Sequence, residues 1–177
     1  MVGRIKLYYT LHMLIILSGL PGAGKTTIAR ELARELAAVY LRIDSIEQSI
    51  RSAGWPVEGE GYSVAHAVAE DNLRLGRTVV ADCVNPWPFT RDEWRSVADR
   101  THVRSLDVEI VCSDAEEHRR RVETRATDID GHRLPRWQEV VERDYRAWER
   151  ERLVIDTARL SVEDSVRTIL AALPVGR

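Results

Sequence analysis

Lysine is almost absent from this chain. Lys6 and Lys25 are the only lysines among 26 basic residues, so arginine supplies nearly all of the positive charge. The two side chains differ chemically, because arginine offers a planar fork of donors whereas lysine ends in a compact ammonium on a flexible stem. Lys25 therefore departs from the habit of the chain, and we expect it to occupy a site that needs an ammonium group.

Cysteine is also scarce, and the two cysteines show no ligand spacing. Cys83 and Cys112 follow or lie on apolar runs, without a C-x-x-C pair. Disulfide scaffolds and structural zinc sites need such clusters. We interpret both cysteines as reduced and mostly buried, and the histidines, His118 included, as structural.

Long hydrophobic runs and an excess of one charge are missing as well. Residues 1–12 are too short and too polar for a signal peptide or membrane anchor, which predicts a cytoplasmic location and no membrane partner. The net charge is −2, with acids and arginines interleaved. This pattern does not favour a nucleic-acid partner, although it leaves one open.

Strand-like and helix-like segments alternate along the whole chain. The 177 residues fit one domain, which we expect at 13–177, with 1–12 as an extension outside the fold. The alternation predicts a three-layer α/β fold, with helices on both faces of a five-stranded parallel sheet. Strands are expected over 13–18, 39–43, 78–81, 106–112 and 153–155, and helices over 26–38, 45–53, 62–75, 90–100, 114–125, 135–150 and 161–173.

The segment 19–26 reads GLPGAGKT, a complete G-x-x-x-x-G-K-[ST] pattern. Such a loop turns backbone N–H groups toward a triphosphate, while Lys25 reaches the β and γ oxygens and the Thr26 hydroxyl ligates Mg²⁺. The motif predicts a P-loop NTPase fold that binds ATP and Mg²⁺. The expected nucleotide-binding residues are Gly19, Leu20, Pro21, Gly22, Ala23, Gly24, Lys25, Thr26 and Thr27.

Two aspartates follow expected strands, at the edge of the sheet where the phosphate loop also emerges. They are Asp44 and Asp82. Ligands of open α/β sheets bind at this edge. We expect Asp44 to activate the hydroxyl that accepts a phosphoryl group and Asp82 to position the metal, although each could instead cap the helix that follows it.

Arginines lead into a polar segment, 126–135, that is expected to form a small lid. Arg121 and Arg125 are four residues apart and are expected on one helix face. Closing the lid would bring guanidinium groups to the transferred phosphoryl group and exclude water. The acceptor pocket is expected near the Gly-rich loop 54–61, which contains Trp55, and near Trp87.

These residues resemble the small P-loop kinases of the nucleoside-monophosphate-kinase-like class. That class includes polynucleotide 5′-hydroxyl kinases, adenylylsulfate kinases, gluconate kinases and chloramphenicol phosphotransferase. The segment 42–50 is similar to the strand end that carries their acceptor-activating aspartate, and Asp82-Cys-Val-Asn85 followed by Arg91 is similar to the polynucleotide kinase branch. The resemblance also implies that Thr157 lies near the adenine site, as in adenylylsulfate kinases.

The expected function is therefore ATP-dependent transfer of a phosphoryl group to a hydroxyl of a small-molecule acceptor. Lys25, Asp44, Arg121 and Arg125 are the expected catalytic residues, and Thr26 and Asp82 the expected metal ligands. Two alternatives stay open. One is a polynucleotide or nucleoside 5′-hydroxyl kinase, and the other is a regulatory P-loop ATPase or nucleotide-binding switch. The acceptor and the oligomeric state are not specified by the sequence.

Overall fold

The computed structural model describes residues 12–174, whose strands form one sheet in the order β2-β3-β1-β4-β5. Every neighbouring pair of strands in it is parallel. The expected α/β fold is therefore confirmed, while residues 1–11 of the expected extension lie outside the described residues. The strands are β1 (Met13–Ser18), β2 (Val39–Arg42), β3 (Val79–Asp82), β4 (Arg104–Val111) and β5 (Leu153–Asp156).

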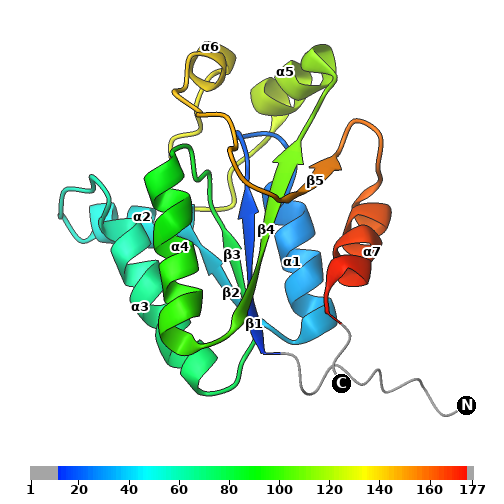
Figure 1. Cartoon of the computed structure of the whole chain (residues 1–177). Coiled ribbons are helices and arrows are strands. Elements are labelled where there is room, and N and C mark those ends of the chain that lie inside the picture. The colour runs from blue at the N-terminus through cyan, green and yellow to red at the C-terminus, as the bar shows by residue number, and fades with distance from the viewer. Residues whose placement is uncertain (1–11, 175–177) are drawn as a thin grey trace, which may run out of the picture.

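Helices cover both faces of this sheet (Figure 1). Helices α1 and α7 pack on one face, and α3 and α4 pack on the other. Within residues 12–174, no helix is long and apolar enough to span a bilayer. The helices are α1 (Lys25–Leu36), α2 (Ile43–Ser52), α3 (Glu60–Arg74), α4 (Pro88–Thr101), α5 (Ala115–Thr124), α6 (Trp137–Val141) and α7 (Val162–Ala172).

Strand β1 is the centre of the core, and all of its residues are buried. Met13, Ile15 and Leu17 face the cluster formed with α1 and α7. Leu14 and Ile16 face the opposite cluster with α3 and α4. Successive side chains of a strand point to opposite faces, so a central parallel strand must be apolar throughout. This packing fixes the start of the phosphate loop, which leaves the end of β1.

The helix expected over 135–150 is wrong in its extent. Helix α6 spans only Trp137–Val141, and residues 142–152, here called the strap, cross the molecule without regular structure. The buried side chain of Arg91 explains the break, because it donates to the carbonyls of Arg146 at 2.7 Å and Ala147 at 3.1 Å. Its guanidinium also lies 4.2 Å from the ring of Trp148. Tertiary contacts here outweigh the helical pattern.

Candidate active site

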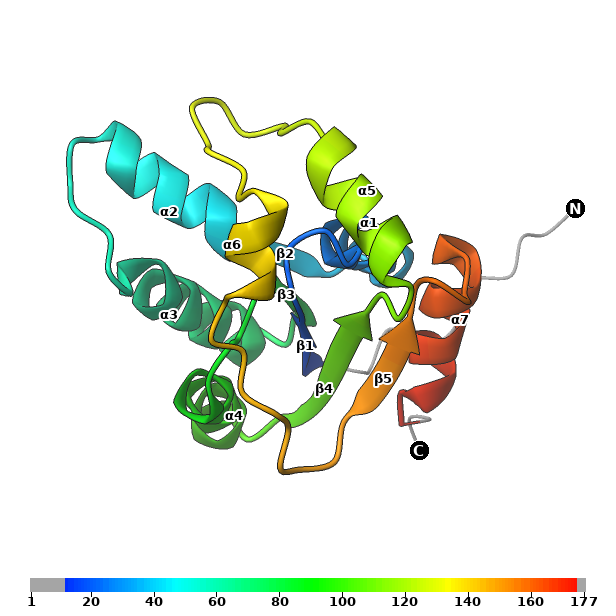
Figure 2. The same ribbon diagram turned by 90° about the horizontal axis from the view of Figure 1, so that it is seen from above.

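A cavity of about 1260 Å³ opens where the carboxyl ends of the strands meet. Figure 2 looks down on this edge, with α2, α3 and α4 on one side and α5 on the other. The cavity gathers most of the expected site residues, including Lys25, Asp44 and Asp82. Gly19, Leu20, Ala23 and Thr157 are not among its lining residues.

The phosphate loop has the backbone that its sequence predicts. Gly22 and Gly24 adopt φ angles of +85° and +99°, a region that other residues rarely tolerate. A side chain at Gly22 would collide with Val122 of α5. Gly24 is the residue before α1, so the loop runs directly into the positive end of a helix dipole.

Lys25 is buried to 7% exposure, and its Nζ donates to the carbonyl of Leu20 at 2.9 Å. Burial lowers the pKa of this ammonium, while the nearby negative charges of Asp82 and Asp44 act in the opposite direction. The structure therefore brings one ammonium and two carboxylates into a single electrostatic neighbourhood. Phosphoryl transfer is promoted by charged groups held in fixed positions around the transferred group, as these are.

Asp82 is the last residue of β3, as expected, and is almost fully buried. Its Oδ2 accepts a hydrogen bond of 2.8 Å from the hydroxyl of Tyr40, on the neighbouring strand β2. Thr26 lies in the first turn of α1 and lines the same cavity. A hydroxyl and a carboxylate are oxygen donors of the kind that Mg²⁺ prefers, so this pair fits the expected metal.

Asp44 does not end a strand as the sequence pattern predicts. Strand β2 stops at Arg42, and Asp44 lies in the first turn of α2. No side-chain cap is formed at the start of this helix, so capping does not account for Asp44. Its carboxylate lines the cavity and is an electrostatic neighbour of Arg125.

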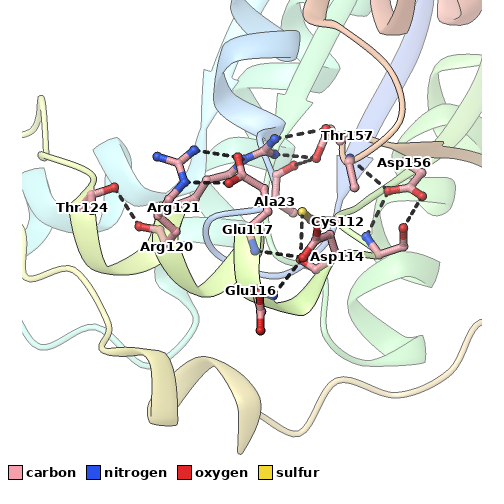
Figure 3. Close-up of polar contacts among 12 residues, drawn as sticks. Ala23, Cys112, Asp114, Glu116, Glu117, Arg120, Arg121, Thr124, Asp156 and Thr157 are labelled. Carbon is pink, nitrogen blue, oxygen red and sulfur yellow. Dashed lines mark hydrogen bonds and ion pairs between the residues drawn. The ribbon is translucent and has the colours of Figure 1, made fainter.

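Arg121 and Arg125 do not share a helix face, because α5 ends at Thr124 and Arg125 is extended. Figure 3 shows the guanidinium of Arg121 engaged by Thr157 and Glu117. It donates to Thr157 Oγ1 at 2.8 Å and to Glu117 Oε1 at 2.8 Å. The side chain of Arg125 instead forms no hydrogen bond within the described part of the chain, and its Nε is buried. Phosphate contact by either arginine stays a prediction.

Thr157 connects three parts of the site (Figure 3). Its hydroxyl lies 2.8 Å from the carbonyl of Ala23 in the phosphate loop and 3.1 Å from the carbonyl of Val111 at the end of β4. The same hydroxyl accepts from Arg121. Thr157 therefore holds the loop against α5, a positioning contact that the sequence comparison with kinases did not specify.

His118 is a further support that the sequence pattern does not reveal. Its Nε2 lies 2.9 Å from the carbonyl of Pro21 in the phosphate loop, and its ring packs edge-on against Trp137. The residue is buried, in agreement with a structural role. These contacts join residues far apart in the sequence, so no local spacing of residues could predict them.

Two stacked aromatic side chains also line the cavity. The rings of Trp87 and Phe89 stack at 5.4 Å with an interplanar angle of 11°, and both are partly exposed. Trp87 Nε1 is held by Asp144 of the strap at 3.0 Å. The expectation for Trp55 is wrong, since it lines a separate shallow apolar groove on α2 and α3.

The cysteines and histidines form no metal cluster. Within residues 12–174, no group of three or more His, Cys, Asp or Glu side chains could hold a metal ion. Cys83 is buried and Cys112 half-buried, and both are free thiols. Burial raises the pKa of the Cys83 thiol well above its usual value, so this residue is chemically quiet.

The parallel sheet, the phosphate loop and the two acids at its edge define a P-loop kinase-like domain. The chain belongs to the AAA_33 family, described as an AAA domain, which matches residues 14–157. A search of curated proteins found no match.

Solved structures with the same fold include two nucleotide complexes. APS kinase CysC from Mycobacterium tuberculosis, solved with AMPPNP and APS, has 17% identity and a TM-score of 0.68, covering 91% of this chain and 96% of its own. A gluconokinase from Sinorhizobium meliloti has 21% identity and a TM-score of 0.60, with coverages of 92% and 91%. Kti12 from Chaetomium thermophilum, solved with ADP-AlF3, has 19% identity and a TM-score of 0.62, with coverages of 92% and 100%.

Proposed function

We propose that this protein is an ATP-dependent phosphotransferase that moves the γ-phosphoryl group to a hydroxyl of a small molecule. One observation carries the proposal. The cavity is lined by Lys25, by Asp44 and also by the stacked rings of Trp87 and Phe89, so it extends beyond the phosphate loop and offers space for a second substrate. The APS kinase and gluconokinase structures share this fold, which supports a kinase reading.

The donor phosphates would be held by the loop amides and Lys25. Thr26 and Asp82 would hold Mg²⁺. When bound, the metal neutralises charge on the phosphate oxygens. Arg125, half-buried at the cavity wall, interacts electrostatically with Asp44 and would stabilise negative charge during transfer.

Asp44 would orient the acceptor and take its proton. The acceptor oxygen attacks the γ-phosphorus, the bond from that phosphorus to the bridging oxygen of ADP breaks, and the hydroxyl proton passes to the Asp44 carboxylate. The carboxylate of Asp44 forms no hydrogen bond or ion pair with the described residues, and Asp44 lines the cavity, so its oxygens are available for this contact.

An acceptor screen tests the proposal. Purified protein is given Mg²⁺, ATP and pools of hydroxyl-bearing compounds, and ADP formation is scored against the acceptor-free rate, with Lys25→Ala as the blank. The proposal expects slow hydrolysis alone and a marked increase with at least one pool. Hydrolysis that is already fast and insensitive to every acceptor would instead support a regulatory ATPase. A response restricted to 5′-hydroxyl oligonucleotides would support a polynucleotide kinase.

A further inference from the structure

Arg42 is a nearly buried cation with an unused edge. Its side chain is only 10% exposed, and its Nη1 donates to Oδ1 of Asp128 at 2.8 Å. Its Nε is buried and has no hydrogen-bond partner. Nε and Nη1 donate from different sides of a guanidinium, so the bond to Asp128 leaves the other edge free. A buried charged donor without an acceptor is costly, which points to a ligand that supplies one.

Arg125 brings a second unpartnered donor to the same cavity. Its Nε is also buried without a partner, and both arginines line the cavity. Burial and the nearby charge of Arg42 lower the pKa of the Arg125 guanidinium, while the charge of Asp44 acts in the opposite direction. An oxyanion between the two guanidinium groups would relieve the repulsion and satisfy both donors.

The position of Arg42 assigns the anion to the acceptor rather than to ATP. Arg42 ends the edge strand β2 and pairs in register with Asp82 of β3, which in turn pairs with Leu17 of β1. Two strand spacings separate it from the strand that feeds the phosphate loop, about 10 Å. It lies only two residues before Asp44, which the proposed function places against the acceptor hydroxyl.

We propose that the free edge of Arg42, with Arg125, forms a subsite for an oxyanion carried by the acceptor, a phosphate or a carboxylate. This inference rests on the proposed function for the side of the cavity that the acceptor occupies. Asp128, which also pairs with Arg30, is a positioning residue that holds the guanidinium of Arg42 in place from the lid segment. The preferred acceptor is then an anionic alcohol.

Binding of inorganic phosphate tests this directly. The protein is first saturated with Mg²⁺ and a non-hydrolysable ATP analogue, so that the donor phosphate positions are filled. Inorganic phosphate, or acetate in a parallel series, is then titrated, and the dissociation constant is taken from the rise in melting temperature. The wild type should bind one of these anions, and the arm that gives the larger rise identifies phosphate or carboxylate as the recognised group.

Arg42→Gln should weaken that binding about tenfold or more, the effect of losing a charge-assisted bidentate contact. Arg42→Lys keeps the charge but not the planar fork of donors, so its affinity for the anion should lie between those of the wild type and Arg42→Gln. It replaces Arg42→Gln if that variant does not fold. Asp128→Asn should weaken binding several-fold. Arg34→Gln, an exposed arginine of α1 with 72% side-chain exposure, is the control and should bind as the wild type does.

Three results would overturn the inference: no anion binding by the loaded wild type, equal binding by the Arg42 variants, or loss of ATP-analogue affinity in those variants, which would place Arg42 in the donor site. No turnover is measured, so this outcome is independent of the acceptor screen. A protein that phosphorylates nothing in the screen can still pass this test, and a kinase for neutral alcohols would fail it.

Discussion

The hydroxyl of Tyr40 donates a hydrogen bond of 2.8 Å to Oδ2 of Asp82, joining the ends of two neighbouring strands. Burial and the charge of Asp82 raise the pKa of Tyr40, so its hydroxyl keeps the proton that it donates. One carboxylate oxygen of Asp82 is thereby fixed in direction. In the proposed mechanism this prepares the other oxygen to hold Mg²⁺ or its water.

Tyr40→Phe removes this hydrogen bond and keeps the ring. We expect a stability loss of about 1 kcal/mol, the usual value for one such bond. The Mg²⁺ concentration needed for half-maximal activity should rise several-fold, because Asp82 is less well oriented. A magnesium titration of ATP turnover at fixed ATP measures this. An unchanged magnesium requirement would mean that the bond serves the sheet alone.

Thr157→Val removes a hydroxyl at nearly constant volume. The phosphate loop then loses its contact between Ala23 and Thr157, and Arg121 loses one acceptor. We expect nucleotide affinity to fall about tenfold, in line with one to two lost hydrogen bonds. Thr157→Ser is the matched control, since it keeps the hydroxyl. Fluorescent-nucleotide titration compares the three proteins, and equal affinity of the Val and Ser variants would disprove the positioning role.

Arg91→Ala should destabilise the strap. The buried guanidinium serves carbonyls of Asn85, Arg146 and Ala147, and its removal leaves them without a donor. We expect a loss of about 3 kcal/mol in the free energy of unfolding, with Arg91→Lys giving little rescue. Urea unfolding measures the loss, and amide exchange over residues 142–152 should quicken.

Arg95→Ala serves as the control for that variant. Arg95 lies half-exposed on the same helix, and its ion pair with Asp107 is long, at 3.8 Å. Its loss should cost about 0.5 kcal/mol. Similar losses in the two variants would show that the contacts of Arg91 with the strap have no special weight.

His66 should make the fold sensitive to mild acid. Burial beside Trp94, at 4.4 Å, and the charge of Arg100 lower the pKa of His66 to about 4, from an ordinary 6.5. The neutral form is therefore favoured in the folded state, so stability is lost as the pH falls from 6.5 toward 4 and no further below that. After a discount for the partial exposure of the His66 side chain, we expect the free energy of unfolding to fall by about 2 kcal/mol across this pH range. In His66→Leu the unfolding free energy should vary less across this window; an identical slope would exclude His66 as the cause.

The sheet and the phosphate loop could be predicted because local sequence dictates them. Strand β1 is a short apolar run buried on both faces, and the loop glycines occupy left-handed backbone positions that few other residues tolerate. Asp82 follows an equally plain apolar strand. These features depend on hydrophobic periodicity and on backbone sterics, and both are determined by residues that are neighbours in the sequence.

The strap and the supports of the loop could not be predicted, because they depend on partners distant in sequence. The pattern from 135 to 150 is amphipathic, yet Arg91 of α4 donates hydrogen bonds to the carbonyls of Arg146 and Ala147, which leaves this segment non-helical. Tyr40 meets Asp82 only because β2 and β3 are neighbours in the sheet. The sequence predicts Asp44 at the end of a strand, whereas it lies in the first turn of α2, because the boundary between β2 and α2 falls within a single apolar stretch.

The most direct test of the central claim is phosphoryl transfer by Asp44→Asn. With an acceptor from the screen, the rate of γ-phosphoryl transfer is compared with nucleotide affinity and melting temperature, using Asp71→Asn on the exposed side of α3 as the matched control. We predict that Asp44→Asn slows transfer by about 10²-fold or more while nucleotide affinity and stability stay unchanged, and that Asp71→Asn behaves as the wild type. An Asp44→Asn protein that transfers phosphate at the wild-type rate would contradict the proposed site.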